Sequence, residues 1–126
     1  METYRVKEGL EYASLTDIIT RTWSGFTTKE YKQFKGLKKE NLRDNMTNLE
    51  IAFNILAEAS ATELSKQRDP KGFQQQKQIA QDGGSVAKAA RNQLEKQLGH
   101  SVISPTKASD YLLPEQTDTI ADEENS

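Results

Sequence analysis

Six cationic residues fall between positions 29 and 43, and they are the residues of this sequence most able to bind a ligand. The same segment holds two acids, Glu30 and Glu40, so its local charge is +4, and Tyr31 and Phe34 are interleaved with the cations. Clustered Lys and Arg side chains can neutralise the phosphates of a nucleic acid. The alternative is a solvated helix surface whose two aromatic residues face the core. The residues expected to make phosphate contacts are Lys32, Lys35, Lys38, Lys39 and Arg43.

The sequence offers few residues that could form a catalytic site. Histidine is the usual general base near neutral pH, and the only one here, His100, follows a predicted helix end, where a surface position is expected. No serine lies in a nucleophile-elbow pattern. The sequence therefore predicts a protein that is not an enzyme. Capping accounts for the hydroxyl residues at the predicted helix starts, which are Ser14, Thr27, Thr47 and Ser85.

Metal and cofactor sites are not expected either. The chain has no cysteine and one histidine, which leaves carboxylates as the main metal ligands, and the acidic pattern of an EF-hand does not occur. Gly83 and Gly84 lack the flanking spacing of a phosphate-binding or dinucleotide-binding loop. We interpret this pair as a turn between two helices, and we predict no metal and no cofactor.

The elements that must position these residues are mainly α-helical. Thr47 and Glu50 form a capping box, which predicts a long central helix from Thr47 to about Gln67, ended by Asp69 and Pro70. An adjoining stripe is formed by Ile51, Ile55 and Ala59. The side chains predicted to form the main apolar stripe of this helix are Leu49, Ala52, Phe53 and Leu56.

Shorter elements are predicted on both sides of the central helix. Before it, we expect a possible short β-hairpin around Glu8 and Gly9, a helix over 14–23, and a second over 27–34 that opens with the Thr27 and Glu30 capping box and ends at Gly36. After it, the pattern predicts a helix over 73–81, a break at residues 82–84 and a helix over 85–98 that ends at Gly99. An extended segment at 102–103 and a last short helix over 104–111 are expected to follow.

Composition divides the chain into a helical domain, residues 1–113, and a disordered acidic tail, residues 114–126. The tail holds five acids and no Lys or Arg, so the 113 residues before it keep all 17 basic residues against 14 of the 19 acids. The body is mildly basic, which is compatible with nucleic acid. No 18-residue apolar run and no secretory signal pattern occurs, so we expect a cytoplasmic protein without membrane contact.

Several segments between about residues 20 and 99 resemble the C-terminal half of the family of DNA-damage-inducible protein D, which is found in bacteria and phages. The resemblance lies in Lys35-Gly36-Leu37-Lys38-Lys39, in the segments 41–50 and 52–57, in residues 83–91, and in Leu98-Gly99. It implies a helical region that lacks the N-terminal BRO-type domain these proteins usually carry. The DNA-binding activity of that domain is therefore not carried over, and neither are any of the family's site residues.

Two functions follow as expectations. The resemblance implies a protein-binding regulatory module in the bacterial DNA-damage (SOS) response or in the control of phages and mobile elements. The basic segment at 29–43 predicts the alternative, a weak and sequence-independent nucleic-acid-binding module. A protein partner is expected in the first case and nucleic acid in the second, and the oligomeric state is left open.

Overall fold

The computed structural model describes the backbone of residues 2–111 and the side chains of residues 13–110. Its elements are α1 (Glu2–Ser24), α2 (Thr28–Lys35), the short 3-10 helix η1 (Arg43–Asn45), α3 (Asn48–Arg68), α4 (Gly72–Leu98) and α5 (Ala108–Tyr111). No strand occurs within this part of the chain, so the predicted mainly α fold is confirmed. The predicted acidic tail, 114–126, lies outside the described residues.

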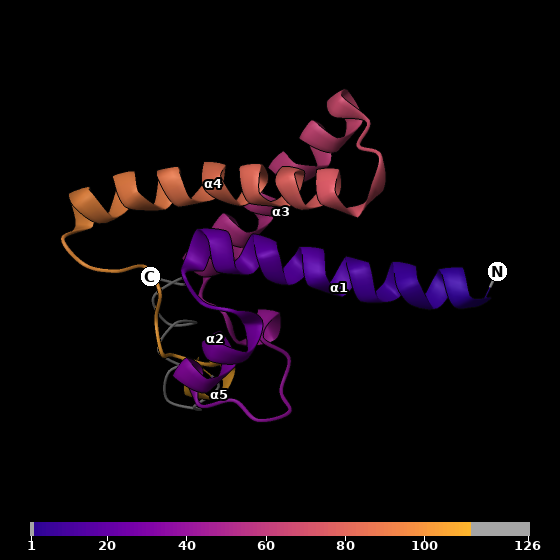
Figure 1. Ribbon diagram of the computed structural model, residues 1–126. Coiled ribbons are helices and arrows are strands. Elements are labelled where there is room, and N and C mark those ends of the chain that lie inside the picture. The colour runs from indigo at the N-terminus through magenta and orange to yellow at the C-terminus, as the bar shows by residue number, and fades with distance from the viewer. Residues whose placement is uncertain (1, 112–126) are drawn as a thin grey trace, which may run out of the picture.

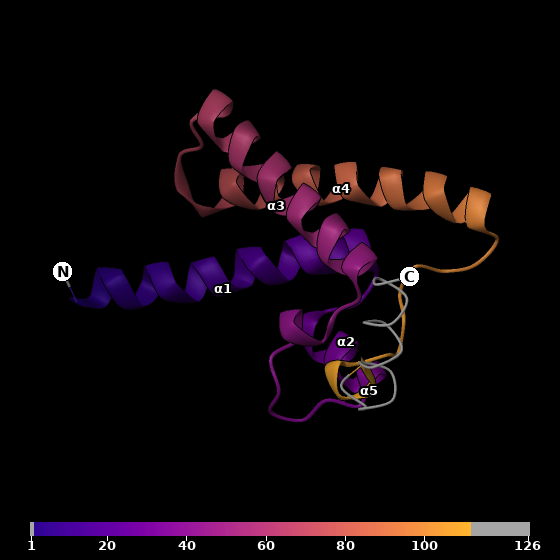
Figure 2. The same cartoon turned by 180° about the vertical axis from the view of Figure 1, so that it is seen from behind.

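Three long helices form the body of the molecule. α4 packs against both α1 and α3, and α3 crosses the other two on the side that faces the viewer in Figure 2. α2, η1 and α5 gather at one end, below the last turns of α1 (Figure 1). The chain returns to this end after α4 through an extended segment, so residues far apart in the sequence meet there.

Capping residues set two of the four helix starts that the sequence predicted, those at Thr27 and Thr47, whereas Ser85 lies inside α4 and caps no helix. Thr27 and Glu30 at α2, and Thr47 and Glu50 at α3, each form a complete capping box, with the side chain of one residue bonded to the backbone N–H of the other. α2 ends at Gly36, which takes the left-handed conformation with φ of 73°. α3 ends at Arg68, because Asp69 turns left-handed and Pro70 follows.

The hairpin predicted near the N-terminus is not formed, because α1 runs without a break from Glu2 to Ser24. The alternation around Glu8 and Gly9 is too brief to hold a strand register. Residues 2–13 are instead rich in Glu, Arg, Lys, Leu and Ala, which favour helix, and a single glycine costs only about 1 kcal/mol there. Ser14 consequently lies inside α1 and is not a helix cap.

The turn predicted at Gly83 and Gly84 is also wrong, since both residues lie inside the unbroken helix α4. They are buried where the three long helices meet. A Cβ added at Gly83 would lie 2.7 Å from the backbone nitrogen of Ala61 in α3, and one at Gly84 would lie 2.6 Å from the Cβ of Thr22 in α1. The glycines therefore allow α4 to approach both neighbours closely, which no larger residue permits.

The core is centred on the aromatic side chains of Trp23, Tyr31 and Phe53. The apolar stripe predicted on the central helix is mostly on its outer side, and of its members only Phe53 is buried. The buried positions of α3 include two polar residues, Glu50 and Asn54, which the apolar pattern could not assign to the core. The Trp23 indole N–H donates to Asn54 Oδ1 at 3.1 Å, so the amide oxygen has a donor inside the core.

The close crossing at Gly83 gives a test of this packing. Gly83→Ala should lower the free energy of unfolding by about 1–3 kcal/mol, because the added methyl meets the α3 backbone, although alanine normally stabilises a helix interior by about 1 kcal/mol relative to glycine. Urea denaturation measures the change. Ser85→Ala, at an exposed position of the same helix, is the control and should change stability by less than about 0.5 kcal/mol. A more stable Gly83→Ala protein would show that the helices are farther apart.

Candidate functional site

The predicted basic segment is divided between the interior and the surface. Lys35, one of the five expected phosphate contacts, has a side chain that is 0% exposed. Its Nζ donates to Glu50 Oε1 at 2.8 Å and to the carbonyl oxygens of Ser104 and Thr106, both at 2.7 Å. All three ammonium protons therefore have acceptors within the protein, and Lys35 is not placed to bind phosphate.

Glu50 is the centre of this buried group. Oε1 also accepts the N–H of Thr47 at 2.8 Å, while Oε2 accepts the Tyr31 hydroxyl and the N–H of Ser104, the latter at 3.2 Å. Within the described residues, every buried side-chain nitrogen or oxygen has a hydrogen-bond partner. We call Tyr31, Lys35 and Glu50 the buried Glu50 cluster. Its charges are paired and its donors and acceptors are filled, which is the condition for keeping an ion pair out of water.

Tyr31 is held in its protonated form by this arrangement. Burial raises the pKa of its phenol well above the ordinary value, and the hydrogen bond to Glu50 and the negative charge of that carboxylate raise the pKa further. Ionised Tyr31 would place a second negative charge beside Glu50, with no water to screen either. The phenol therefore serves as a fixed hydrogen-bond donor.

The cluster fastens the segment that follows α4. Gly99 ends α4 with φ of 80°, and residues 99–107, which we call the C-terminal strap, then pass to α2 (Figure 1). Two hydrogen bonds from Lys35 and one to Glu50 hold the strap, and its own side chains Val102 and Ile103 are buried in the core. At its end the N–H of Ala108 donates to Asn45 Oδ1 at 2.8 Å.

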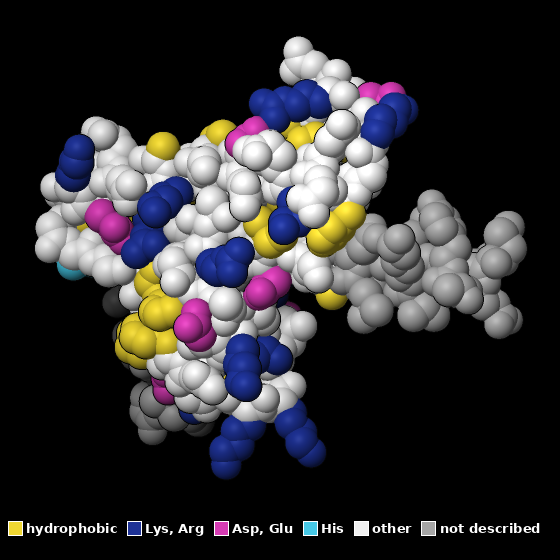
Figure 3. Space-filling model, viewed as in Figure 1, with side chains coloured by type: hydrophobic (Ala, Val, Ile, Leu, Met, Phe, Trp, Pro, Cys, Tyr) yellow, Lys and Arg dark blue, Asp and Glu magenta, His cyan; other side chains and the backbone are white. Residues whose placement is uncertain are grey.

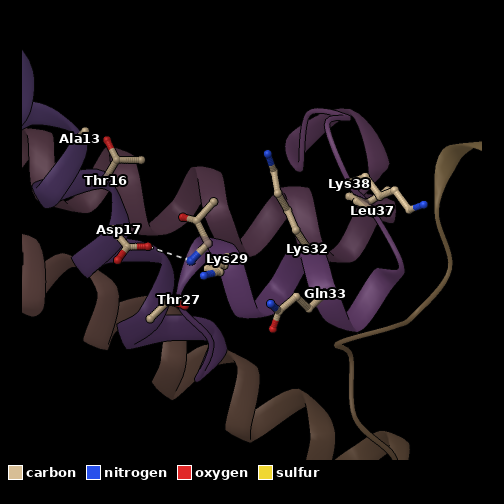
Figure 4. A pocket seen from close by; sticks show the side chains of 10 residues that line it. Ala13, Thr16, Asp17, Thr27, Lys29, Lys32, Gln33, Leu37 and Lys38 are labelled. Atoms are coloured by element: carbon tan, nitrogen blue, oxygen red, sulfur yellow. Dashed lines mark hydrogen bonds between the residues drawn. The ribbon is translucent and has the colours of Figure 1, made fainter.

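A cleft of about 1070 Å³ lies between α1 and α2, and three lysines line it. Figure 4 shows Lys29 and Lys32 on α2 and Lys38 on the following loop, opposite Thr16 and Asp17 of α1. Asp17 Oδ1 accepts the N–H of Thr28 at 2.8 Å, which ties the start of α2 to α1. Asp17 is the one carboxylate among the described residues that line the cleft. On the face seen in Figure 3, Lys and Arg side chains lie over α2 and the loop after it, and others are spread over the long helices.

The five candidate cations thus have different positions. Lys32 and Lys38 line the cleft, Lys39 is exposed on the loop next to it, and Arg43 pairs with Glu58 at 3.0 Å in an exposed ion pair. Lys29 joins them in the cleft, although it was not among the candidates. The spacing of three residues between Lys29, Lys32 and Lys35 does not by itself separate them. The signal that the sequence offered is that Lys35 lies four residues after Tyr31 and shares its buried face.

A second surface feature is an apolar face on α3. Its side chains are exposed, although the sequence predicted them as core, and three are large, with exposed fractions of 43% for Leu49, 47% for Ile55 and 36% for Leu56. Ala52 and Ala59 complete the face, and no charged residue lies among them. We call these five residues the exposed α3 face.

The exposed α3 face continues into a groove of about 700 Å³ between the start of α3 and the strap. Leu49 belongs to both surfaces. The groove lining also includes Met46, Val102 and Pro105, and none of its described residues is Lys, Arg, Asp or Glu. His100 lies at its edge and is exposed, with Nδ1 at 3.0 Å from the carbonyl oxygen of Ser101.

Comparison with protein-family models, with curated proteins and with solved structures finds no match for this chain. The resemblance to the family of DNA-damage-inducible protein D therefore stays a prediction from the sequence. Among the described helices, none is long and apolar enough to cross a membrane.

The buried Glu50 cluster predicts a large difference between two ion pairs of this protein. Lys35→Met should lower the free energy of unfolding by about 3–5 kcal/mol, because it leaves Glu50 without its counter-charge in the interior. Arg43→Met removes the cation of the exposed pair with Glu58 and should cost less than about 1 kcal/mol. Denaturant titration of both variants checks this, and equal effects would show that water reaches Lys35.

Proposed function

We propose that this chain is a non-enzymatic module that binds a helix of a partner protein on the exposed α3 face. The observation that carries the proposal is the set of three large apolar side chains, Leu49, Ile55 and Leu56, that α3 exposes together. Contiguous exposed apolar surface is costly in water and is a common mark of a protein-binding surface.

The shape of the face favours a helix as the ligand. Residues 49–59 span about 15 Å along α3 at about 1.5 Å per residue, which corresponds to three turns of an opposing helix. The small side chain of Ala52 lies between Leu49 and Ile55, and Ala59 lies one turn beyond Ile55, so side chains of a second helix can enter at both places. Since the face carries no charge, the residues that meet it must be apolar, as on one side of an amphipathic helix.

The size of the face favours a transient complex. A standard stable interface takes about 20–30 residues from each partner, and the exposed α3 face has five. The adjoining groove adds Val102 and Pro105 to the available surface. An interface of this kind suits a regulatory contact that forms and dissociates, rather than a permanent dimer.

The proposal includes that the chain is not an enzyme, and the buried Glu50 cluster supports this part of the proposal. Tyr31, Lys35 and Glu50 are the side chains whose chemistry most resembles an active site, yet they are buried and bonded to one another. The biological setting we propose, a cytoplasmic regulator in the bacterial DNA-damage response or in phage and mobile-element control, rests on the resemblance of residues 20–99.

The proposal predicts that Ile55→Lys weakens partner binding at least about 10-fold, because the new charge would be buried without a counter-charge in the complex. Affinity purification from bacteria, with and without DNA damage and with nuclease added, would compare the partners that each variant retains. Val86→Lys on α4 is the matched control, since Val86 is 46% exposed and Ile55 is 47% exposed.

The expected result is a partner retained by the wild type and by Val86→Lys after nuclease treatment, and lost by Ile55→Lys. Equal retention by both variants would contradict the proposal. Because Ile55 is half exposed, Ile55→Lys should change the free energy of unfolding by less than about 0.5 kcal/mol. A much larger loss would show that another part of this chain covers the face, and the proposal would then be wrong.

A further inference from the structure

We infer that the cleft between α1 and α2 binds the phosphate backbone of nucleic acid through Lys29, Lys32 and Lys38. These three side chains belong to two elements, α2 and the loop after it, and the fold brings them to one cleft of about 1070 Å³. None of them takes part in an ion pair within the described residues, whereas Arg43, Arg68 and Arg91 do. Their charges are therefore available to an external anion.

The described residues that line the cleft carry more positive than negative charge, with three lysines against one carboxylate. That carboxylate, Asp17, accepts the N–H of Thr28 and so faces the start of α2. Glu40, the nearest acid in the loop, accepts the backbone N–H groups of Lys38 and Lys39 at 2.9 and 3.0 Å. Both carboxylates are thus held by backbone donors, and neither forms a salt bridge with a cleft lysine.

The arrangement of the lysines favours a polymer over a small anion. In Figure 4 the side chains of Lys32 and Lys38 point in different directions, so their ammonium groups do not converge on one point. A single phosphate would be held by one of them at a time. A chain of phosphates can meet several lysines along its length, and the hydroxyls of Thr16 and Thr28 at the cleft can add neutral donors to phosphate oxygens.

Among the described residues that line the cleft, none is placed to read bases. The large apolar residue among them is Leu37, which is buried, and the exposed aromatic Phe34 is not one of them. Binding by phosphate contacts alone is independent of sequence and sensitive to salt, because each contact releases counterions from the nucleic acid. This site does not share residues with the exposed α3 face, so each of the two proposals can fail without the other.

The test is a titration of labelled duplex DNA with the full chain at several salt concentrations. Three contacts predict a slope of log K against log salt of about −2.7, which is roughly a 40-fold loss of affinity between about 50 and 200 mM salt. A double variant with both Lys29→Gln and Lys38→Gln should keep only the contact from Lys32. Its slope should be about −0.9, which is roughly a 3.5-fold loss of affinity over the same range of salt. On single strands the wild-type slope should be about −2.1.

A matched variant separates local contacts from overall charge. Lys88→Gln with Lys96→Gln removes the same charge from exposed positions of α4, far along the chain from the cleft, and should keep the wild-type slope. Ile55→Lys should also bind DNA with the wild-type slope, because it lies outside the cleft.

Four results would overturn the inference. The first is no DNA binding by the wild type at low salt, and the second is a slope near zero for the wild type. The third is a slope for the double variant of the cleft that equals that of the wild type, and the fourth is a slope for the double variant of α4 that falls as much as that of the cleft variant. Inorganic polyphosphate serves as competitor, and binding of polyphosphate without binding of DNA or RNA would equally show that the ligand is not a nucleic acid.

Discussion

A carboxylate that is shut off from water needs a counter-charge and a donor for each oxygen, and Glu50 imposes this requirement on the whole lower end of the molecule. Lys35 supplies the charge from α2, Tyr31 supplies a hydroxyl, and Ser104 supplies an N–H from the strap. The same carboxylate closes the capping box of α3 through Thr47. One side chain thus links two helices, a helix start and the returning chain, so their positions depend on each other.

A second constraint acts where the three long helices meet, and there the constraint is steric rather than electrostatic. Gly83 and Gly84 let α4 lie against α3 and α1 at distances that a side chain would prevent. This close approach buries the side of α3 that carries Ala57 and Ala61, and turns Leu49, Ile55 and Leu56 to the outside. The exposed α3 face is therefore a consequence of where the glycines place α4.

The two proposed binding surfaces differ in chemistry and in the elements that support them. The exposed α3 face is uncharged and lies on one rigid helix, so binding there would be driven by removal of apolar surface from water. The cleft is cationic and lies between α1 and α2, whose spacing is fixed by the bond from Thr28 to Asp17. The affinity of the cleft for its ligand would fall as the salt concentration rises. A module with both surfaces could hold a protein and a nucleic acid at the same time.

The sequence by itself determined the helix boundaries at Thr27, Thr47 and Gly99, because capping depends on residues only a few positions apart. It also located the basic segment that contributes Lys32 and Lys38 to the cleft. Tertiary structure alone decided that Gly83 and Gly84 are a helix crossing rather than a turn, that Lys35 is buried, and that α3 exposes Leu49, Ile55 and Leu56. Each of these outcomes depends on contact with a residue that is distant in the chain, such as Ala61 for Gly83 or Ser104 for Lys35. The local sequence pattern does not show which distant residues will come into contact.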